Sequence, residues 1–266
     1  MRRNLLRVLT APLPLLVAVG LFTAPARAES STYGSATRYV AMGDSFSAGL
    51  GAPGADLTCG RSPLGYPTLW AQAHGIASFT DVTCGGAVTD DVVAKQIPSL
   101  NAGTDVVTIT IGGNDAAWGS QVLTCMQSGD AACASAVDKA VVDLPAITAK
   151  IDTTYAAIRQ AAPNATVYVL GYPLLFEETA GCSAWIVPDQ YQRQQIDRFG
   201  RALNRSIADS AARAGFRFVD AQAFFAGHAV CSRQAWIHPV LNLTPLHPDA
   251  GGYRFGYLAA LTSVTG

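Results

Sequence analysis

The sequence places a serine where a strand is predicted to end, which is a position suited to a nucleophile. Ser45 lies in the stretch Gly43–Gly49, directly after the apolar run 39–42. Glycine before the serine and Ala48-Gly49 after it allow the backbone to turn sharply, and a hydroxyl held at a strand end is accessible to a substrate. A Gly-Asp-Ser sequence is more often only a turn, so its interpretation depends on what the chain places beside Ser45.

Two further predicted strand ends carry hydrogen-bond donors. Gly86 follows a second strand within the stretch Cys84–Ala87, and its N–H can approach a ligand because no Cβ stands in the way. Asn114 follows a third strand within the stretch Gly112–Asp115 and offers a side-chain amide. Each is also common in ordinary turns and caps. Together with the N–H of Ser45, they form a set of donors that can stabilise an oxyanion.

A serine nucleophile also needs a base, and the chain has four histidines: His74, His228, His238 and His247. His74 lies in a predicted helix, where packing explains it. His247 precedes Pro248, and a proline at the first position of a helix would hold the imidazole at the helix mouth. This spacing favours His247 as the base without excluding His238. An unperturbed imidazole, with a pKa of about 6.5, predicts activity that rises from about pH 5 to about pH 8.

Strands that alternate with helices provide the frame for these groups. The predicted strands are 38–42, 78–83, 106–111, 166–170 and 216–219. The third and fourth are β-branched and apolar, as strands buried on both faces are. The alternation predicts a parallel sheet with helices on both faces, and ligands of such sheets bind at the carboxyl ends of the strands. We therefore expect Ser45, Gly86 and Asn114 to meet at one edge.

The clearest predicted helices each have one apolar face. Apolar residues recur every three or four positions over 144–158 and over 196–211. Asp189 is a suitable N-cap for the second of these helices, and Gly215 is a suitable stop. A last helix is predicted to begin near Pro248.

The first 28 residues have the pattern of a secretory signal peptide. Arginines precede an apolar run over 9–24, and Ala26–Ala28 offers small residues for cleavage. Residues 29–266 are then sufficient for a single α/β domain. We expect a secreted, extracellular protein without stable membrane insertion, because no later stretch has 18 uninterrupted apolar residues.

The charge balance argues against a nucleic-acid partner. The chain has 18 basic and 19 acidic residues, and the first 28 residues contain four arginines and no acid. The remainder therefore has 14 basic and 19 acidic residues, a net charge of about −5. Nucleic-acid binding needs a basic surface, and neither the three lysines nor any basic run provides one.

All six cysteines follow the predicted signal peptide. An even number in a secreted chain predicts disulfides, but six cysteines allow 15 pairings and the sequence alone does not choose among them. There is no Cys-x-x-Cys and no His-Glu-x-x-His, so no metal site is predicted.

Four blocks of the sequence carry a family resemblance. Gly43-Asp44-Ser45, Gly86, Gly113-Asn114-Asp115 and His247-Pro248 appear in the order of the four blocks of the SGNH (GDSL) hydrolases. The chain resembles the secreted actinobacterial branch of lipases, phospholipases and esterases with three disulfides, over about residues 38–262. The resemblance implies a flavodoxin-like, three-layer α/β/α sandwich with a five-stranded parallel sheet. It also implies sequential disulfides: Cys59–Cys84, Cys125–Cys133 and Cys182–Cys231.

The resemblance also implies roles for individual residues. Ser45 would be the nucleophile and His247 the base, and the oxyanion donors would be the N–H groups of Ser45 and Gly86 and the side chain of Asn114. Most of the family has an aspartate three residues before the histidine, where this chain has Thr244. We expect a backbone carbonyl, that of Thr244 or of a neighbour in the same turn, to orient the ring. Asp220 and Asp249 remain as alternative acids.

These observations predict a secreted carboxylic-ester hydrolase that works through a Ser-His dyad and an acyl-enzyme, without cofactor or metal. We expect a monomer whose partner is an ester with an acyl chain. Apolar residues that follow the strands would suit an acyl groove or ordinary packing: Trp118, Leu174, Leu175, Phe176, Trp185, Trp236, Leu241 and Leu243. A carbohydrate O-acetyl esterase is the alternative enzyme, and a catalytically dead secreted binding protein is the alternative of another class.

Overall fold

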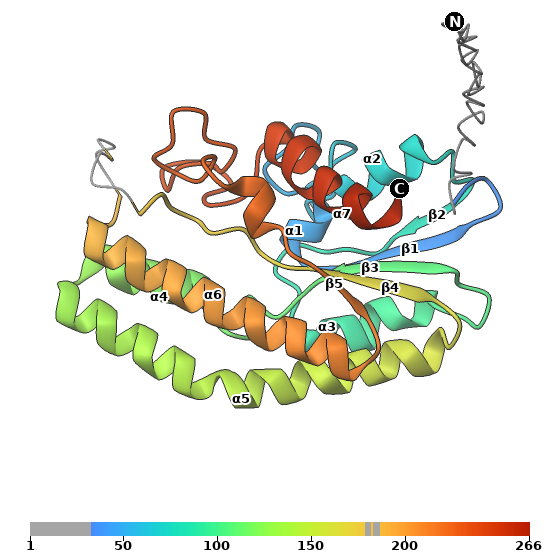
Figure 1. Cartoon of the computed structure of the whole chain (residues 1–266), viewed down its shortest axis with the longest axis horizontal. Coiled ribbons are helices and arrows are strands. Elements are labelled where there is room, and N and C mark those ends of the chain that lie inside the picture. Colours follow the sequence, from blue (N-terminus) through green and yellow to red (C-terminus); the bar gives the residue numbers. More distant parts are fainter. Residues whose placement is uncertain (1–32, 179–181, 183–186) are drawn as a thin grey trace, which may run out of the picture. The chain divides into compact units, whose positions relative to one another are not determined.

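Five parallel strands form a sheet through the centre of the protein (Figure 1). The computed structural model describes residues 33–178, 182 and 187–266, so the predicted signal peptide, 1–28, lies outside the described residues. The strand order is β2-β1-β3-β4-β5. The strands are β1 (Arg38–Gly43), β2 (Ser78–Asp81), β3 (Val106–Thr110), β4 (Thr166–Leu170) and β5 (Arg217–Val219). The prediction of five parallel strands is confirmed.

Helices cover both faces of this sheet, which confirms the three-layer α/β/α fold. The α-helices are α1 (Ser45–Ala48), α2 (Tyr66–Ala73), α3 (Thr89–Asp91), α4 (Trp118–Gln127), α5 (Asp130–Ala161), α6 (Gln190–Arg213) and α7 (Leu258–Thr265). Shorter 3₁₀ or π segments are η1 (Val92–Gln96), η2 (Ile97–Ser99), η3 (Gln222–Phe225) and η4 (Gly252–Tyr257). Figure 1 shows α2 and α7 on one side of the sheet, and α3, α5 and α6 on the other.

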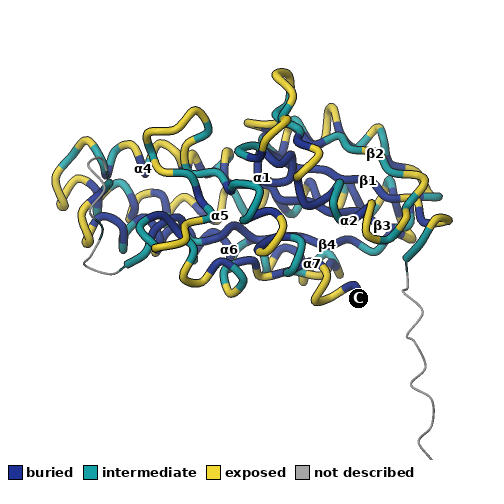
Figure 2. The backbone as a smooth tube through the Cα atoms, turned by 90° about the horizontal axis from the view of Figure 1, so that it is seen from above, coloured by how far each residue is buried: buried dark blue, intermediate teal, exposed yellow. Residues whose placement is uncertain are grey.

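The central strands are the most deeply buried part of the sheet. All five residues of β3 and five of the six residues of β1 are buried, and both strands run dark blue through the middle of Figure 2.

The described residues fall into one compact unit. None of their helices is long and apolar enough to cross a membrane.

The helix boundaries follow the predicted caps in part. Asp189 caps α6 by accepting the N–H of Gln192 at 2.9 Å, and Gly215 follows the helix with a φ of 67°. The last helix was predicted to begin near Pro248, and helical backbone begins two residues later, at Ala250. Pro248 precedes the cap, Asp249, which accepts the N–H of Gly252 at 2.8 Å.

Helix α5 is much longer than the predicted segment 144–158. It begins at Asp130, and its buried stripe continues toward the N-terminus through Ala140, Val137 and Cys133. Alanine and cysteine are weak markers of an apolar face, which is why the first half of this helix was missed. Pro145 lies inside the helix.

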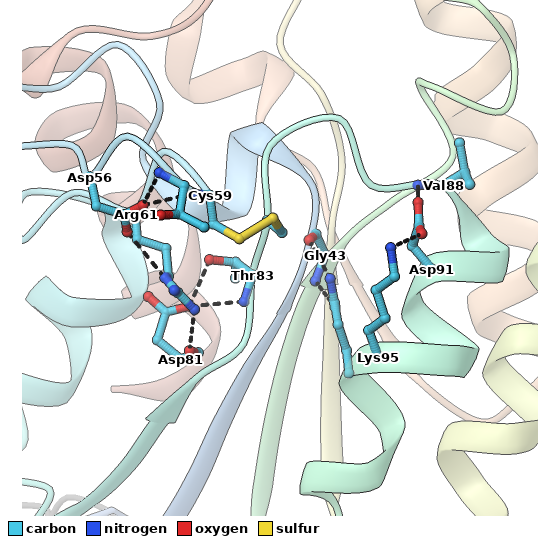
Figure 3. Close-up of a disulfide and its surroundings, with 12 residues drawn as sticks. Gly43, Asp56, Cys59, Arg61, Asp81, Thr83, Val88, Asp91 and Lys95 are labelled. Carbon is cyan, nitrogen blue, oxygen red and sulfur yellow. Dashed lines mark hydrogen bonds and ion pairs between the residues drawn. A yellow bond between two sulfur atoms is a disulfide. The ribbon is translucent and has the colours of Figure 1, made fainter.

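Disulfides join the cysteines in the sequential order that the family resemblance implied. The bonds are Cys59–Cys84, Cys125–Cys133 and Cys182–Cys231. Cys59–Cys84 ties the loop after α1 to the loop after β2 (Figure 3). The N–H of Gly85 also donates to the carbonyl of Cys59 at 2.7 Å, so the two loops are joined twice.

Candidate active site

The turn that carries Ser45 requires glycine at the end of β1. Gly43 has a φ of 113°, and a Cβ there would lie 2.3 Å from the carbonyl oxygen of Thr110. The side chain of Gln96 holds both backbone groups of Gly43: Gly43 N–H donates to Oε1 at 2.7 Å, and Nε2 donates to the carbonyl at 2.9 Å. Figure 3 shows Gly43 in these bonds. The amide of Gln96 therefore fixes both the N–H and the carbonyl of the backbone just before the serine.

Ser45 is the first residue of the single-turn helix α1. Asp44 caps this helix by accepting the N–H of Phe46 at 2.9 Å. The first N–H groups of a helix have no partner within the helix, so the N–H of Ser45 is available to an anion. Ser45 is 7% exposed. The residue is therefore buried, whereas the sequence led us to expect an accessible side chain.

His247 lies within hydrogen-bond distance of this hydroxyl. Its Nε2 is 2.8 Å from Oγ of Ser45, and its Nδ1 is 2.8 Å from the carbonyl oxygen of Pro245. Because a carbonyl can only accept, Nδ1 carries the proton and Nε2 has the free lone pair. This is the tautomer that can take a proton from Ser45.

The carbonyl beside the ring belongs to Pro245, a neighbour of Thr244 in the expected turn, and not to Thr244 itself. The Thr244 carbonyl instead accepts the backbone N–H of His247 at 3.4 Å. Leu246, which lies between Pro245 and His247, has a φ of 60°. This left-handed conformation reverses the chain, so that the Pro245 carbonyl faces the imidazole ring.

The two alternative acids are engaged elsewhere. Asp220 accepts the N–H of Gln222 at 2.9 Å, and Asp249 accepts that of Gly252 at 2.8 Å. His238, the alternative base, places Nε2 at 2.9 Å from the carbonyl of Gly51. None of the three has a hydrogen bond to Ser45 or to the ring of His247 in the part of the chain that the structure describes.

Burial sets the protonation state of His247. It lowers the pKa of the imidazole from 6.5 to about 4, although the hydrogen bond to Pro245 acts in the opposite direction. The ring also lies against Phe46, with 4.9 Å between the ring centroids. The histidine is therefore neutral, and able to accept a proton, at any pH well above 4.

This shift changes the expected pH dependence of catalysis. We expect kcat/KM for a soluble ester to rise with pH through a midpoint of about 4 and to change little from about pH 6 to about pH 8. An unperturbed histidine would still give roughly a fourfold rise over that interval. A rate profile for the folded enzyme with its midpoint near 6.5 would contradict the effect of burial.

The fold must be monitored in the same experiment. The unfolded chain protonates this histidine below about pH 6.5, while the folded chain does not until about 4. The free energy of unfolding therefore decreases as the pH falls through that range. Circular dichroism at each pH separates loss of the base from loss of structure.

The two loops that carry the remaining donors are bonded to each other. Nδ2 of Asn114 donates to the carbonyl of Ala87 at 2.9 Å, and both the N–H and the hydroxyl of Thr89 donate to Asp115, at 3.0 and 2.6 Å. Gly86 has a φ of 77°, and its N–H has no hydrogen-bond partner among the described residues. This N–H and the second amide hydrogen of Asn114 remain for a ligand.

Tyr172 connects the nucleophile turn to the Asn114 turn. Its hydroxyl donates to Asp44 at 2.5 Å and accepts the N–H of Gly113 at 2.9 Å. Tyr172 and Asp44 are each 1% exposed. Burial raises the pKa of Asp44 to about 7, although the bond from Tyr172 lowers it. Because the folded state holds this proton to a higher pH than the unfolded chain, this contribution to stability decreases as the pH rises toward 7.

We expect Tyr172→Phe to lower both stability and turnover. It leaves the buried N–H of Gly113 without a partner, which costs about 1–3 kcal/mol, and it releases the Asn114 turn from the Ser45 turn, which lowers kcat by up to about 100-fold. Tyr155→Phe is the matched control, because the Tyr155 hydroxyl is buried without a hydrogen-bond partner in the described chain. Equal effects of both substitutions on kcat would show that the bridge does not position the site.

A pocket of about 480 Å³ opens over these groups. Its lining includes Ser45, Gly86, Asn114 and His247, and most of the other side chains are apolar: Phe46, Leu50, Trp118, Val122, Leu123, Met126, Leu175, Val240 and Leu246. No group of three His, Cys, Asp or Glu side chains among the described residues is placed to hold a metal ion.

The residues expected to form an acyl groove are only partly brought together. Trp118 and Leu175 line this pocket, whereas Leu174 and Phe176 line a separate cavity. Trp236 stacks on His228, with 3.4 Å between the ring centroids. Leu241 and Leu243 are exposed, and Trp185 lies outside the described residues.

Several residues of the site were not identified from the sequence. Val122 and Met126 line the pocket from α4, a helix of which only Trp118 was named from the sequence. Gln96 and Tyr172 act through backbone groups of residues far away in the chain. The residues next to Gln96 and Tyr172 in the sequence do not indicate these distant partners.

Comparisons with known proteins agree with this geometry. Residues 41–255 match the GDSL-like lipase/acylhydrolase family. A lipase from Streptomyces rimosus is 41% identical over 268 residues, which cover 97% of this chain and 98% of the relative. The crystal structure of the extracellular lipase of Streptomyces rimosus has a TM-score of 0.82 at 40% identity, covering 86% of this chain and 100% of that one. That of phospholipase A1 from Streptomyces albidoflavus NA297 has a TM-score of 0.81 at 39% identity, covering 85% and 98%.

Proposed function

Since this chain belongs to the GDSL-like lipase/acylhydrolase family and is a carboxylic ester hydrolase, we propose that Ser45 and His247 are its catalytic dyad. The observation that carries this proposal is the 2.8 Å contact between Oγ of Ser45 and Nε2 of His247, at the bottom of an apolar pocket. The neutral carbonyl of Pro245 holds the ring in the productive tautomer, and no carboxylate of a described residue bonds to the ring.

The proposed reaction proceeds in two halves. Ser45 Oγ attacks the ester carbonyl carbon while Nε2 of His247 takes the hydroxyl proton, and the carbonyl oxygen becomes an oxyanion. The N–H groups of Ser45 and Gly86 and the amide of Asn114 stabilise that oxyanion. Its collapse expels the alcohol, which receives the proton from His247. Water, activated by the same histidine, then attacks the acyl-enzyme and releases the acid and the free serine.

The pocket supports an acyl chain as the substrate group. Its lining is mainly aliphatic and aromatic, and α4 contributes one wall through Trp118, Val122 and Met126. The similar proteins are described as lipases and as a phospholipase A1. We infer that acyl glycerols or phospholipids are the substrates.

A series of nitrophenyl esters from acetate to palmitate tests the substrate class. Each methylene that enters the pocket contributes about 0.8 kcal/mol, so kcat/KM should rise up to roughly fourfold per methylene until the pocket is filled. A carbohydrate O-acetyl esterase would instead be fastest on acetate.

Labelling of the intact protein by a fluorophosphonate tests the remaining alternative, since a catalytically dead binding protein would not react.

Export is the second part of the proposal. The three disulfides need an oxidising compartment, and the first 28 residues have the signal-peptide pattern. We propose that the mature protein begins at Glu29 and acts outside the cell. We also propose that it acts as a monomer. N-terminal sequencing of protein from the culture medium checks the cleavage site.

A further inference from the structure

Two leucines beside the pocket are open to solvent. Leu241 is 71% exposed and Leu243 is 101% exposed. They lie between Val240 and Pro245, which line the pocket, on the same segment that carries His247. Across the pocket, Leu123 of α4 is a lining residue and is 52% exposed. We call Leu123, Leu241 and Leu243 the apolar rim.

The segment that presents Leu241 and Leu243 is held at its base. His238 N–H donates to the carbonyl of His247 at 2.9 Å, and Leu246 N–H donates back to the carbonyl of His238 at 3.1 Å. In Figure 1 this segment belongs to the dark-orange loop that rises beside α7. These paired backbone bonds close the segment at its base, and Nε2 of His238 lies 2.9 Å from the carbonyl oxygen of Gly51 in the body of the protein.

Polar contacts inside the tip favour the outward position of the leucines. Oδ1 of Asn242 accepts the N–H and the hydroxyl of Thr244, at 2.9 and 3.2 Å, and its Nδ2 lies 3.3 Å from Nδ1 of His238. Asn242 thus occupies the inside of the turn. The leucines on either side of it remain largely exposed to solvent, although apolar side chains are more stable when buried.

Both segments that form the rim lack charged side chains. Residues 116–129 and 234–248 contain no Asp, Glu, Lys or Arg. An exposed apolar residue elsewhere has charged neighbours. Val142, which is 75% exposed on α5, lies next to the ion pair of Lys139 and Asp143. An apolar rim without charges, continuous with an apolar pocket, suits a surface of hydrocarbon better than it suits water or a charged partner.

We propose that the apolar rim docks onto the surface of a lipid aggregate and turns the mouth of the pocket toward the acyl chains. This proposal rests on the proposed function, since it assigns the physical state of the substrate. The leucines enter the hydrocarbon while the base of the segment keeps His247 against Ser45. Because the rim has no charged residues, binding should depend little on the charge of the lipid headgroup or on salt.

Flotation with vesicles of a dialkyl-ether phosphatidylcholine tests docking, because this lipid has no ester to hydrolyse. Leu241→Ser/Leu243→Ser should lower the partition coefficient by at least about tenfold, while kcat/KM on nitrophenyl butyrate stays within about twofold of the parent. Val142→Ser is the matched control and should bind as the parent does. Raising salt from about 0.1 M to about 1 M, which shortens the Debye length from roughly 10 Å to roughly 3 Å, should leave binding almost unchanged.

Three results would overturn the docking proposal. One is unchanged vesicle binding by the double variant. Another is binding that requires anionic lipid and disappears at high salt. The third is a dimer, detected by analytical ultracentrifugation, that the double variant abolishes, because a second copy would then cover the rim. Failure of the proposed function is a separate outcome, in which the parent hydrolyses no acyl ester whether or not it floats with vesicles.

Discussion

Replacement of Ser45 by alanine is expected to lower kcat for ester hydrolysis by four to six orders of magnitude, on the order of the loss caused by removing a serine nucleophile elsewhere. The fold should persist, because the hydroxyl of Ser45 bonds to His247 and to no other described residue. Hydrolysis of nitrophenyl esters, together with thermal unfolding, measures both effects. Residual activity of more than a few per cent would exclude Ser45 as the nucleophile.

Ser47 provides a control two positions away. Its hydroxyl accepts the N–H of Thr110 at 2.9 Å and lies 3.1 Å from that of Tyr66, and the residue is completely buried. Ser47→Ala should therefore lower stability by about 1–3 kcal/mol and still react with a fluorophosphonate. Ser45→Ala should remain unlabelled while it stays folded. Labelling of Ser45→Ala but not of Ser47→Ala would reverse the assignment.

Loss of the base is expected to be as severe as loss of the nucleophile. His247→Ala should lower kcat to within about tenfold of Ser45→Ala, and the double variant should be no slower than either single variant, because the two residues act as a unit. Single-turnover rates at pH 7 measure this. Additive losses in the double variant would mean that His247 acts independently of Ser45.

Single-turnover rates at pH 7 also decide whether a carboxylate acts together with Ser45 and His247. Asp220→Asn and Asp249→Asn should each keep kcat within about tenfold, whereas removal of a triad aspartate costs about 10⁴-fold. Asparagine still accepts the backbone N–H of Gln222 or Gly252, so the local structure is preserved. A loss near 10⁴ in either variant, with normal circular dichroism, would identify that residue as the acid.

The parts of the fold that depend on local signals could be predicted from the sequence. The β-branched runs at 106–111 and 166–170 became β3 and β4 almost residue for residue. The strand ends then determined where Ser45 and Asn114 meet, because parallel strands end at one edge of the sheet. The family blocks singled out His247, which spacing alone favoured without excluding His238.

Other features depend on contacts that the sequence does not display. Which carbonyl of the expected turn faces the ring depends on the left-handed backbone of Leu246, and a leucine gives no sign of that conformation in the sequence. Tyr172 reaches Asp44 across 128 positions of the chain. Such long-range hydrogen bonds become visible only when tertiary packing is known.

The link between the loops of Cys59 and Cys84 has a consequence for how the enzyme is prepared. Without the disulfide, the loop of Cys59 would hold the Gly86 loop through the backbone bond from Gly85 to Cys59 and no longer through a covalent bond. Protein made in a reducing cytosol would then be a mixture of molecules with and without a fixed Gly86 loop, which carries one of the proposed oxyanion donors. Its specific activity would report the oxidised fraction and not the turnover number of a competent molecule. Titration of active sites by the burst of released nitrophenol would count the competent molecules, and rates divided by that count should agree between batches whose activities per milligram differ.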